Sequence, residues 1–171
     1  MRKTVGFLIS GFLLIFLIGC NGNEYKLEWH DTKEEAIAHG TAEEGIEDSS
    51  ILSIEEINEE TIVFYTFKGS FGVASIAESD EGYAWYRSTN YVGFSGEGPY
   101  VTMGFSFETE SGNEISVLVG KASDDNISKM RLSGDGAEKE LQVFEGSRLF
   151  FTTHEAPFHS LELTPIEENK S

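Results

Sequence analysis

Hydrophobic and polar residues alternate along most of the chain after residue 50, and this pattern predicts β-strands. In the stretch 100–109, YVTMGFSFET, every second position from Val101 to Phe107 is apolar and those between are small or polar. A strand with this period of two buries one face and leaves the other in water. Turn-forming residues separate the predicted strands, which cover 51–57, 61–67, 71–78, 83–94, 100–109, 114–121, 127–133, 139–144, 148–153 and 159–166.

A single good helix signal precedes these strands, over residues 31–45 with the sequence DTKEEAIAHGTAEEG. Thr32 followed three residues later by Glu35 forms a capping box, which predicts the start of the helix. Gly45 is suited to end it in the left-handed conformation. Gly40 weakens the helix interior, and we expect it to let the helix pack closely on its own sheet.

About ten strands exceed what one open sheet holds comfortably. We therefore predict a β-dominant α+β fold, in which one N-terminal helix packs on an antiparallel meander or sandwich. The stretch SGEGP at 95–99 divides a single domain, 31–165, into a helix-plus-meander half (31–94) and an all-β half (99–165). Residues 166–171 form a predicted tail.

The first 19 residues have the layout of a secretory signal. Arg2 and Lys3 precede an apolar run, VGFLISGFLLIFLI at 5–18, that closes on Gly19. A membrane-spanning helix needs about 20 apolar residues, and polar residues begin at Asn21, so the run is too short to span. We predict a signal peptide over 1–19 and a polar tether over 20–30.

The tetrad LIGC at 17–20 resembles the lipobox of bacterial lipoproteins, although Ile18 stands where a smaller residue is usual. The resemblance implies that Cys20 becomes the first mature residue and carries a diacylglycerol thioether. Two acyl chains give stable anchoring, so the resemblance also implies location at the cell membrane, on its extracytoplasmic face. Cys20 is the only cysteine, which leaves no partner in the chain for a disulfide. Its position between an apolar segment and a polar linker does not fit a catalytic thiol.

The chain is strongly acidic, with a formal net charge of −18. Loss of Arg2 and Lys3 with the signal peptide would bring this to −18 − 2 = −20. Such a charge excludes nucleic acid as a partner, and it makes membrane association depend on the lipid anchor. The acidic residues are dispersed in pairs, which favours a role in solubility over attraction of cations or basic partners.

The stretch HEAPFH at 154–159 is the main candidate for a metal site, with His154, Glu155 and His159 as weak candidate ligands. A zincin needs His-Glu-x-x-His on a helix, whereas here the spacing is longer and Pro157 breaks a helix. We expect a turn instead. The acidic loops 121–128 and 133–140 lack the ligand order of a calcium loop, so we predict hairpin turns there, with weak cation binding as the alternative.

Aromatic residues gather around the loop that joins the two halves. Adjacent Trp85 and Tyr86 point to opposite sides of a strand, so one of them can face outward. Exposed tryptophan and tyrosine near loops often dock sugar rings or partner side chains. A core and a binding surface are therefore both open interpretations of the set Trp85, Tyr86, Tyr91, Phe94 and Tyr100.

As a whole, the chain resembles small lipoproteins of Gram-positive spore-forming bacteria, on its MRKT head, lipobox, acidic helix and β-rich body. No nucleophile elbow and no Cys-His pair occurs in the sequence, and no cofactor motif is present. The leading hypothesis is a non-enzymatic, membrane-anchored module that interacts with an envelope component. The alternatives are a small-ligand or cation-binding lipoprotein and, third, a metal-dependent hydrolase using His154, Glu155 and His159.

Overall fold

The computed structural model describes residues 27–168 and confirms the predicted β-dominant α+β fold. One α-helix, α1 (Lys33–Glu44), and two 3₁₀ turns, η1 (Asp48–Ser50) and η2 (Phe158–Ser160), accompany the strands of this region. The strands are β1 (Trp29–His30), β2 (Ile51–Ile57), β3 (Glu60–Phe67), β4 (Ser70–Ser79), β5 (Gly82–Arg87), β6 (Tyr100–Glu108), β7 (Glu114–Ala122), β8 (Ile127–Ser133), β9 (Lys139–Gln142), β10 (Leu149–Thr153) and β11 (Glu162–Glu167).

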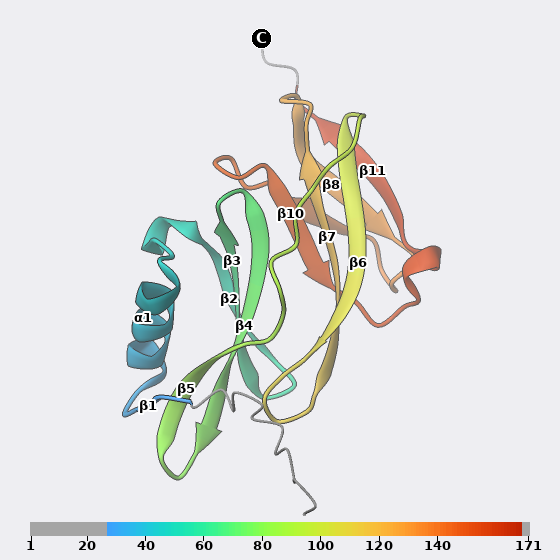
Figure 1. Ribbon diagram of the computed structural model, residues 1–171. Coiled ribbons are helices and arrows are strands. Elements are labelled where there is room, and N and C mark those ends of the chain that lie inside the picture. Colours follow the sequence, from blue (N-terminus) through green and yellow to red (C-terminus); the bar gives the residue numbers. More distant parts are fainter. Residues whose placement is uncertain (1–26, 169–171) are drawn as a thin grey trace, which may run out of the picture.

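The strands form three antiparallel sheets, with α1 on the outer side of the first (Figure 1). Sheet A has the order β1-β5-β4-β3-β2, sheet B the order β10-β7-β6, and sheet C the order β11-β8-β9. One hydrophobic core lies between α1 and sheet A, a second between sheets A and B, and a third between sheets B and C. The domain is thus a stack of four layers.

The central strand β7 has both faces buried. Val117 and Val119 pack in the core shared with sheet A, whereas Leu118 packs in the core shared with sheet C. A strand covered on both faces needs a continuous apolar run in place of alternation, which explains the sequence ISVLVG at 115–120.

Helix α1 begins and ends where its capping residues predict. The Thr32 hydroxyl accepts a hydrogen bond from the Glu35 amide at 3.2 Å, and Gly45 adopts a left-handed φ of 69°. Gly40 lies directly against the ring of Trp85 on β5, where an added Cβ would stand 2.1 Å from Trp85 Cγ. The absent side chain at Gly40 therefore sets the spacing between helix and sheet, as predicted.

Several boundaries differ from the sequence predictions. Strand β5 ends at Arg87, and residues 88–99 cross toward sheet B with only a bridge between Val92 and Phe71. Strand β1 lies within the predicted tether 20–30, and β11 runs two residues into the predicted tail 166–171. Both β1 and β11 are held by pairing, to β5 and β8. Cys20 and the signal segment 1–19 lie outside the described residues.

Within 27–168, no helix is both long and apolar enough to span a bilayer.

Candidate functional site

The aromatic residues around the inter-half loop do not form one surface, because they divide among the cores. Trp85 is only 8% exposed, and its Nε1 donates to Glu44 Oε1 at 2.9 Å. The Tyr91 hydroxyl donates to Glu44 Oε2 at 2.5 Å. Burial and this hydrogen bond raise the pKa of Tyr91. Both residues thus belong to the contact between α1 and sheet A.

The other three aromatic residues also pack in different parts of the fold. Phe94 packs against the core between sheets A and B, and Tyr100 packs against that between sheets B and C. The Tyr100 hydroxyl donates to the Leu163 carbonyl at 3.3 Å. Tyr86, half-buried, lies on the opposite side of β5 from Trp85. The five side chains therefore do not form one continuous surface, since alternation along β5 and the crossing segment send them into different layers.

The HEAPFH segment forms the expected turn and does not gather its metal-ligand candidates. His154 Nδ1 lies 2.8 Å from the Ala156 carbonyl, so this nitrogen carries the proton. The Nε2 atom is buried and has no hydrogen-bond partner within residues 27–168. His159 is on the exposed turn η2. Among the described residues, the side chains that approach closely enough to share a metal ion are instead Glu28, His30 and His39.

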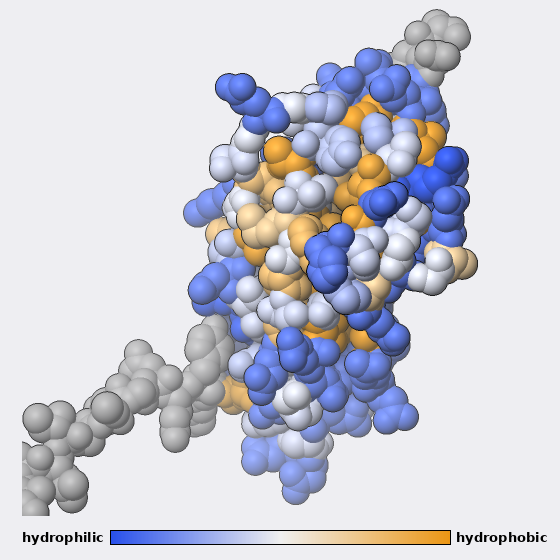
Figure 2. Space-filling model, turned by 90° about the vertical axis from the view of Figure 1, so that its right-hand side faces the viewer, coloured by the Kyte–Doolittle hydropathy of each residue, from blue (hydrophilic) through white to orange (hydrophobic). Residues whose placement is uncertain are grey.

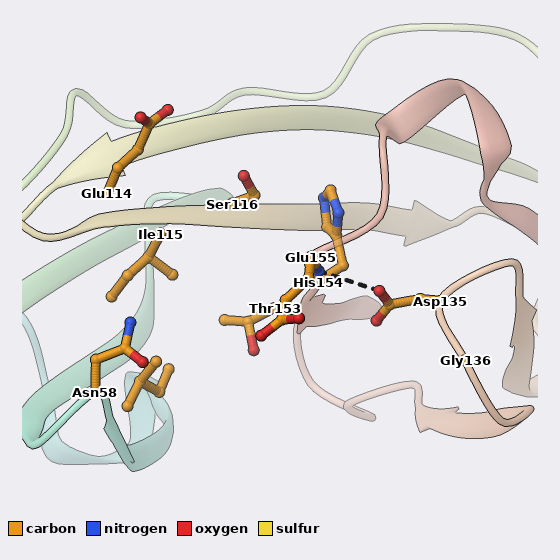
Figure 3. Close-up of a pocket in the computed structure, with 10 residues that line it drawn as sticks. Asn58, Glu114, Ile115, Ser116, Asp135, Gly136, Thr153, His154 and Glu155 are labelled. Carbon is orange, nitrogen blue, oxygen red and sulfur yellow. Dashed lines mark hydrogen bonds between the residues drawn. The ribbon is translucent and has the colours of Figure 1, made fainter.

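An open cleft of about 810 Å³ lies beside this turn, between the start of β7 and the loop after β8 (Figure 3). Two of its polar side chains, those of Asp135 and Ser116, are already engaged in hydrogen bonds. Asp135 Oδ1 accepts the Glu155 and Ala156 amides, each at 3.0 Å, and Oδ2 lies 3.0 Å from Lys139 Nζ. The Ser116 hydroxyl pairs with the Ser106 hydroxyl at 3.0 Å. These contacts favour a structural role for the cleft over acid–base or nucleophilic chemistry.

The Asp135 carboxylate should make the domain less stable as the pH is lowered into the acidic range. Hydrogen bonds from the Ala156 amide and from Lys139 lower its pKa to about 2. The folded state depresses this pKa below that of an aspartate in the unfolded chain, which is ~4. The ionised carboxylate therefore stabilises the fold at pH values above ~4, and this stabilisation is lost as the pH falls toward ~2. We expect Asp135→Asn to lower the free energy of unfolding by about 1–2 kcal/mol at pH 7, measured by urea titration.

The matched control is Asp125→Asn in the neighbouring acidic loop, since Asp125 is exposed. This variant should change stability by less than ~0.5 kcal/mol. The difference between the two variants should shrink as the pH is lowered to ~2–3. A loss for Asp135→Asn that is the same at pH 3 and pH 7 would contradict this role of the carboxylate.

Strand β6 has an unusual edge. It is the last strand of sheet B, and it pairs with β7 without a register break from Tyr100 opposite Ala122 to Glu108 opposite Glu114. Exposed edges are normally protected by charges, proline or bulges. In the nine residues of β6, Glu108 at the end is the only charge, and proline and lysine are absent.

Three of the other edge strands carry such protection, whereas the remaining two, β1 and β10, are short, with two and five residues. Strand β2 has Glu55 and Glu56 and a register shift near its start. Strand β9 has Lys139 and Glu140, and β11 has Pro165. Strand β6, with nine residues, is therefore the longest edge strand of the described domain, and its edge is regular and nearly uncharged.

Exposed hydrophobic side chains lie on or against the same strand. Met103 is 43% exposed, and Phe158 from η2 is 46% exposed. The Phe158 ring lies directly against Gly104 of β6, where an added Cβ would stand 2.2 Å from Phe158 Cδ2. Figure 2, from the side on which β6 and β11 lie in Figure 1, shows a band of hydrophobic residues between hydrophilic ends. We call Tyr100–Glu108 together with Phe158 the β6 surface.

The alternating pattern predicts that Met103 is buried, and it carries no signal for the exposed ring of Phe158. The alternation at 100–109 fixes which side chains share a face, but β6 stands at the edge of sheet B, so the face is covered at Phe107 and open at Met103. The uncharged edge of β6 was visible in the sequence. Only the strand order shows that β6 is an edge strand.

Comparison of the chain with protein-family models, curated protein sequences and solved structures finds no significant match, so the function is inferred from the geometry of the described residues.

Proposed function

We propose that the protein is a lipid-anchored, extracytoplasmic and non-enzymatic module that binds an extended segment of another envelope protein along β6. The observation that carries this proposal is the unprotected edge of β6 beside the exposed side chains of Met103 and Phe158. An extended peptide that adds to a sheet edge gains affinity from main-chain hydrogen bonds. Pockets for its alternate side chains provide specificity.

The chemistry of the β6 surface defines the partner segment. Met103 lies on one face of β6 and Phe158 covers Gly104 on the other, so the two favour apolar side chains on both faces of the added strand. The domain around this surface is acidic, with a net charge of −18 for the chain. A segment flanked by lysine or arginine would therefore associate faster than a neutral one, and its association would weaken with salt.

The anchoring part of the proposal rests on Cys20, which lies outside the described residues. Cys20→Ser should abolish labelling by a lipid probe and release the protein from the membrane fraction, because one thioether carries both acyl chains needed for stable attachment. A Cys20→Ser protein that stays labelled would contradict the anchor. Met103→Lys is the control, and it should be labelled like the natural chain.

The binding part is tested by photo-crosslinking in cells from Thr102, which is exposed on β6. We expect a discrete adduct with one envelope protein. Met103→Lys places a charge on the edge and should reduce the adduct by about tenfold or more, the loss expected for a central contact.

Ile54→Lys on β2 is the matched control, because Ile54 is 50% exposed and also lies on an edge strand. This variant should leave the adduct from Thr102 unchanged. An adduct that Met103→Lys does not weaken, or that Ile54→Lys weakens equally, would contradict binding at β6. An adduct with the mass of two copies of this chain would replace the proposal with self-association.

A further inference from the structure

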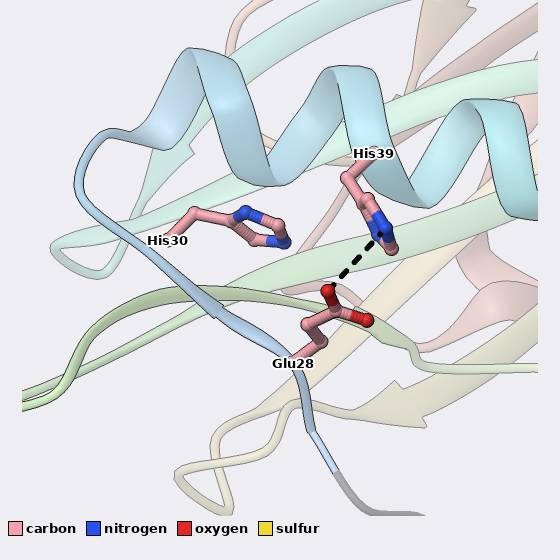
Figure 4. Close-up of side chains that lie close together, drawn as sticks. All are labelled: Glu28, His30 and His39. Carbon is pink, nitrogen blue, oxygen red and sulfur yellow. Dashed lines mark ion pairs between the residues drawn. The ribbon is translucent and has the colours of Figure 1, made fainter.

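Two histidines and a glutamate lie close together at the N-terminal end of the described residues, beside α1 (Figure 4). Glu28 immediately precedes β1, His30 ends β1, and His39 lies on α1. Their ligand atoms all lie within 4.8 Å of one another. The imidazole rings of His30 and His39 are 4.7 Å apart between centroids. Figure 4 shows His39 pointing down from the helix toward Glu28, with the His30 ring beside it.

The backbone on both sides of this cluster is held in place by the fold. His39 precedes Gly40, which contacts Trp85 and fixes the helix on sheet A. His30 pairs with Tyr83 in the β1–β5 ladder. At Gly82 an added Cβ would stand 2.1 Å from the His30 carbonyl oxygen, so the two strands approach closely there. The Cα positions of the two histidines are therefore set before any ligand binds.

The separation of the ligand atoms is close to that of a tetrahedral metal site. Bonds of about 2.0–2.1 Å place the ligands of a tetrahedral Zn²⁺ roughly 3.3 Å apart. His39 Nε2 and Glu28 Oε1 are 3.5 Å apart. Glu28 is 63% exposed and His39 is 37% exposed. Small rotamer changes can therefore close the remaining gap without moving the core.

A second carboxylate lies near the other ring nitrogen of His39. Glu43 Oε2, one helical turn further along α1, lies 3.9 Å from His39 Nδ1, on the other nitrogen of the ring from Glu28. A carboxylate on one imidazole nitrogen selects the tautomer that leaves the other nitrogen free to bind a metal. A cavity of about 310 Å³, lined by all four side chains, gives access from solvent.

We propose that Glu28, His30 and His39 bind a divalent transition-metal ion, with Zn²⁺ the best fit, and that Glu43 positions His39. Imidazole nitrogens favour zinc over calcium and magnesium, which prefer oxygen ligands in larger number. Three protein ligands leave a fourth position for water. The formal charge of the two carboxylates balances that of the ion.

The site would tie the beginning of the folded domain to α1. Its ligands come from the segment that leads back toward Cys20 and from a helix that is packed on sheet A. Metal binding would therefore secure β1, a strand of only two residues, and fix the direction in which the chain leaves the domain. This inference is independent of strand addition at β6, which lies in a different sheet.

The test is calorimetric titration of Zn²⁺ into the full-length chain, purified in detergent through a tag that contains no histidine. We expect one equivalent to bind, and a rise in melting temperature of about 5–10 °C at a hundredfold excess over Kd. His39→Ala and His30→Ala should each weaken binding by about a hundredfold, and Glu43→Gln should weaken it by about tenfold.

The chain contains four histidines, and the other two supply the matched controls. His154→Ala and His159→Ala should bind Zn²⁺ like the natural chain. Glu28→Gln tests a ligand whose exposed side chain can be replaced without loss of packing, and circular dichroism in chelator checks the fold of every variant. Absence of saturable binding, unchanged binding by both His39→Ala and Glu28→Gln, or loss of binding with His154→Ala would overturn the proposal.

Discussion

Replacing Glu44 with alanine should lower the free energy of unfolding by about 3–5 kcal/mol, the largest loss we expect from a single side chain. The Glu44 side chain is only 10% exposed, at the end of α1. It accepts hydrogen bonds from Trp85 Nε1 at 2.9 Å, from the Tyr91 hydroxyl at 2.5 Å and from the Tyr65 hydroxyl at 3.3 Å. Alanine would leave these donors without their acceptor in a largely buried position.

The same network predicts a dependence on alkaline pH. Burial, followed by the charge of Glu44, raises the pKa of Tyr65 above its ordinary range. Because the folded value is raised, this tyrosine contributes stability below about pH 10 that is lost as the pH rises further, where the unfolded chain ionises. The natural chain should therefore lose stability above pH ~10 more steeply than Glu44→Ala, in which the nearby carboxylate is gone.

Urea titrations at neutral and alkaline pH, with a chelator present, measure both effects. The control is Glu43→Ala, since Glu43 is the adjacent helix residue and its side chain is 67% exposed. Its loss should stay below ~0.5 kcal/mol. Similar losses for Glu43→Ala and Glu44→Ala would mean that the Glu44 hydrogen bonds do not hold the helix on the sheet.

The elements of this fold were predictable where local sequence decides them. Strand β2 covers the predicted 51–57, and α1 is bounded by Thr32 and Gly45 as its caps indicate. Caps, turns and a period of two are local signals that act before tertiary contacts form. Strand β1 was missed because two residues carry no period, and only pairing with β5 defines them.

The candidate sites were less predictable because they depend on which layers meet. Trp85 and Tyr86 were known to point to opposite sides of a strand, but the sequence does not say that α1 covers the Trp85 side. Glu28, His30 and His39 have no motif spacing, since a strand and a helix supply them. By contrast, His154, Glu155 and His159 are neighbours in sequence that the turn around Pro157 keeps from converging.

Gly40→Ala should destabilise the domain by about 2–3 kcal/mol, although alanine is the better helix former. Helix propensity alone favours the substitution by roughly 1 kcal/mol. Against this, the new Cβ would stand 2.1 Å from Trp85 Cγ and 2.3 Å from Trp85 Cδ2. Trp85 cannot withdraw easily, because its ring is buried and its Nε1 is bound to Glu44. Overpacking of a core by one carbon costs about 1–3 kcal/mol, occasionally more, so the steric term should dominate.

Thermal and urea unfolding of three variants separates packing from helix propensity. Ala38→Gly, on the exposed side of α1, should lose about 1 kcal/mol by propensity alone. Trp85→Leu removes the ring that opposes the new Cβ, so Gly40→Ala should be neutral or stabilising in that background, with a coupling energy of about 2 kcal/mol or more. A Gly40→Ala protein more stable than the natural chain would show that helix α1 is free to move off Trp85, and that the close helix–sheet contact does not limit stability.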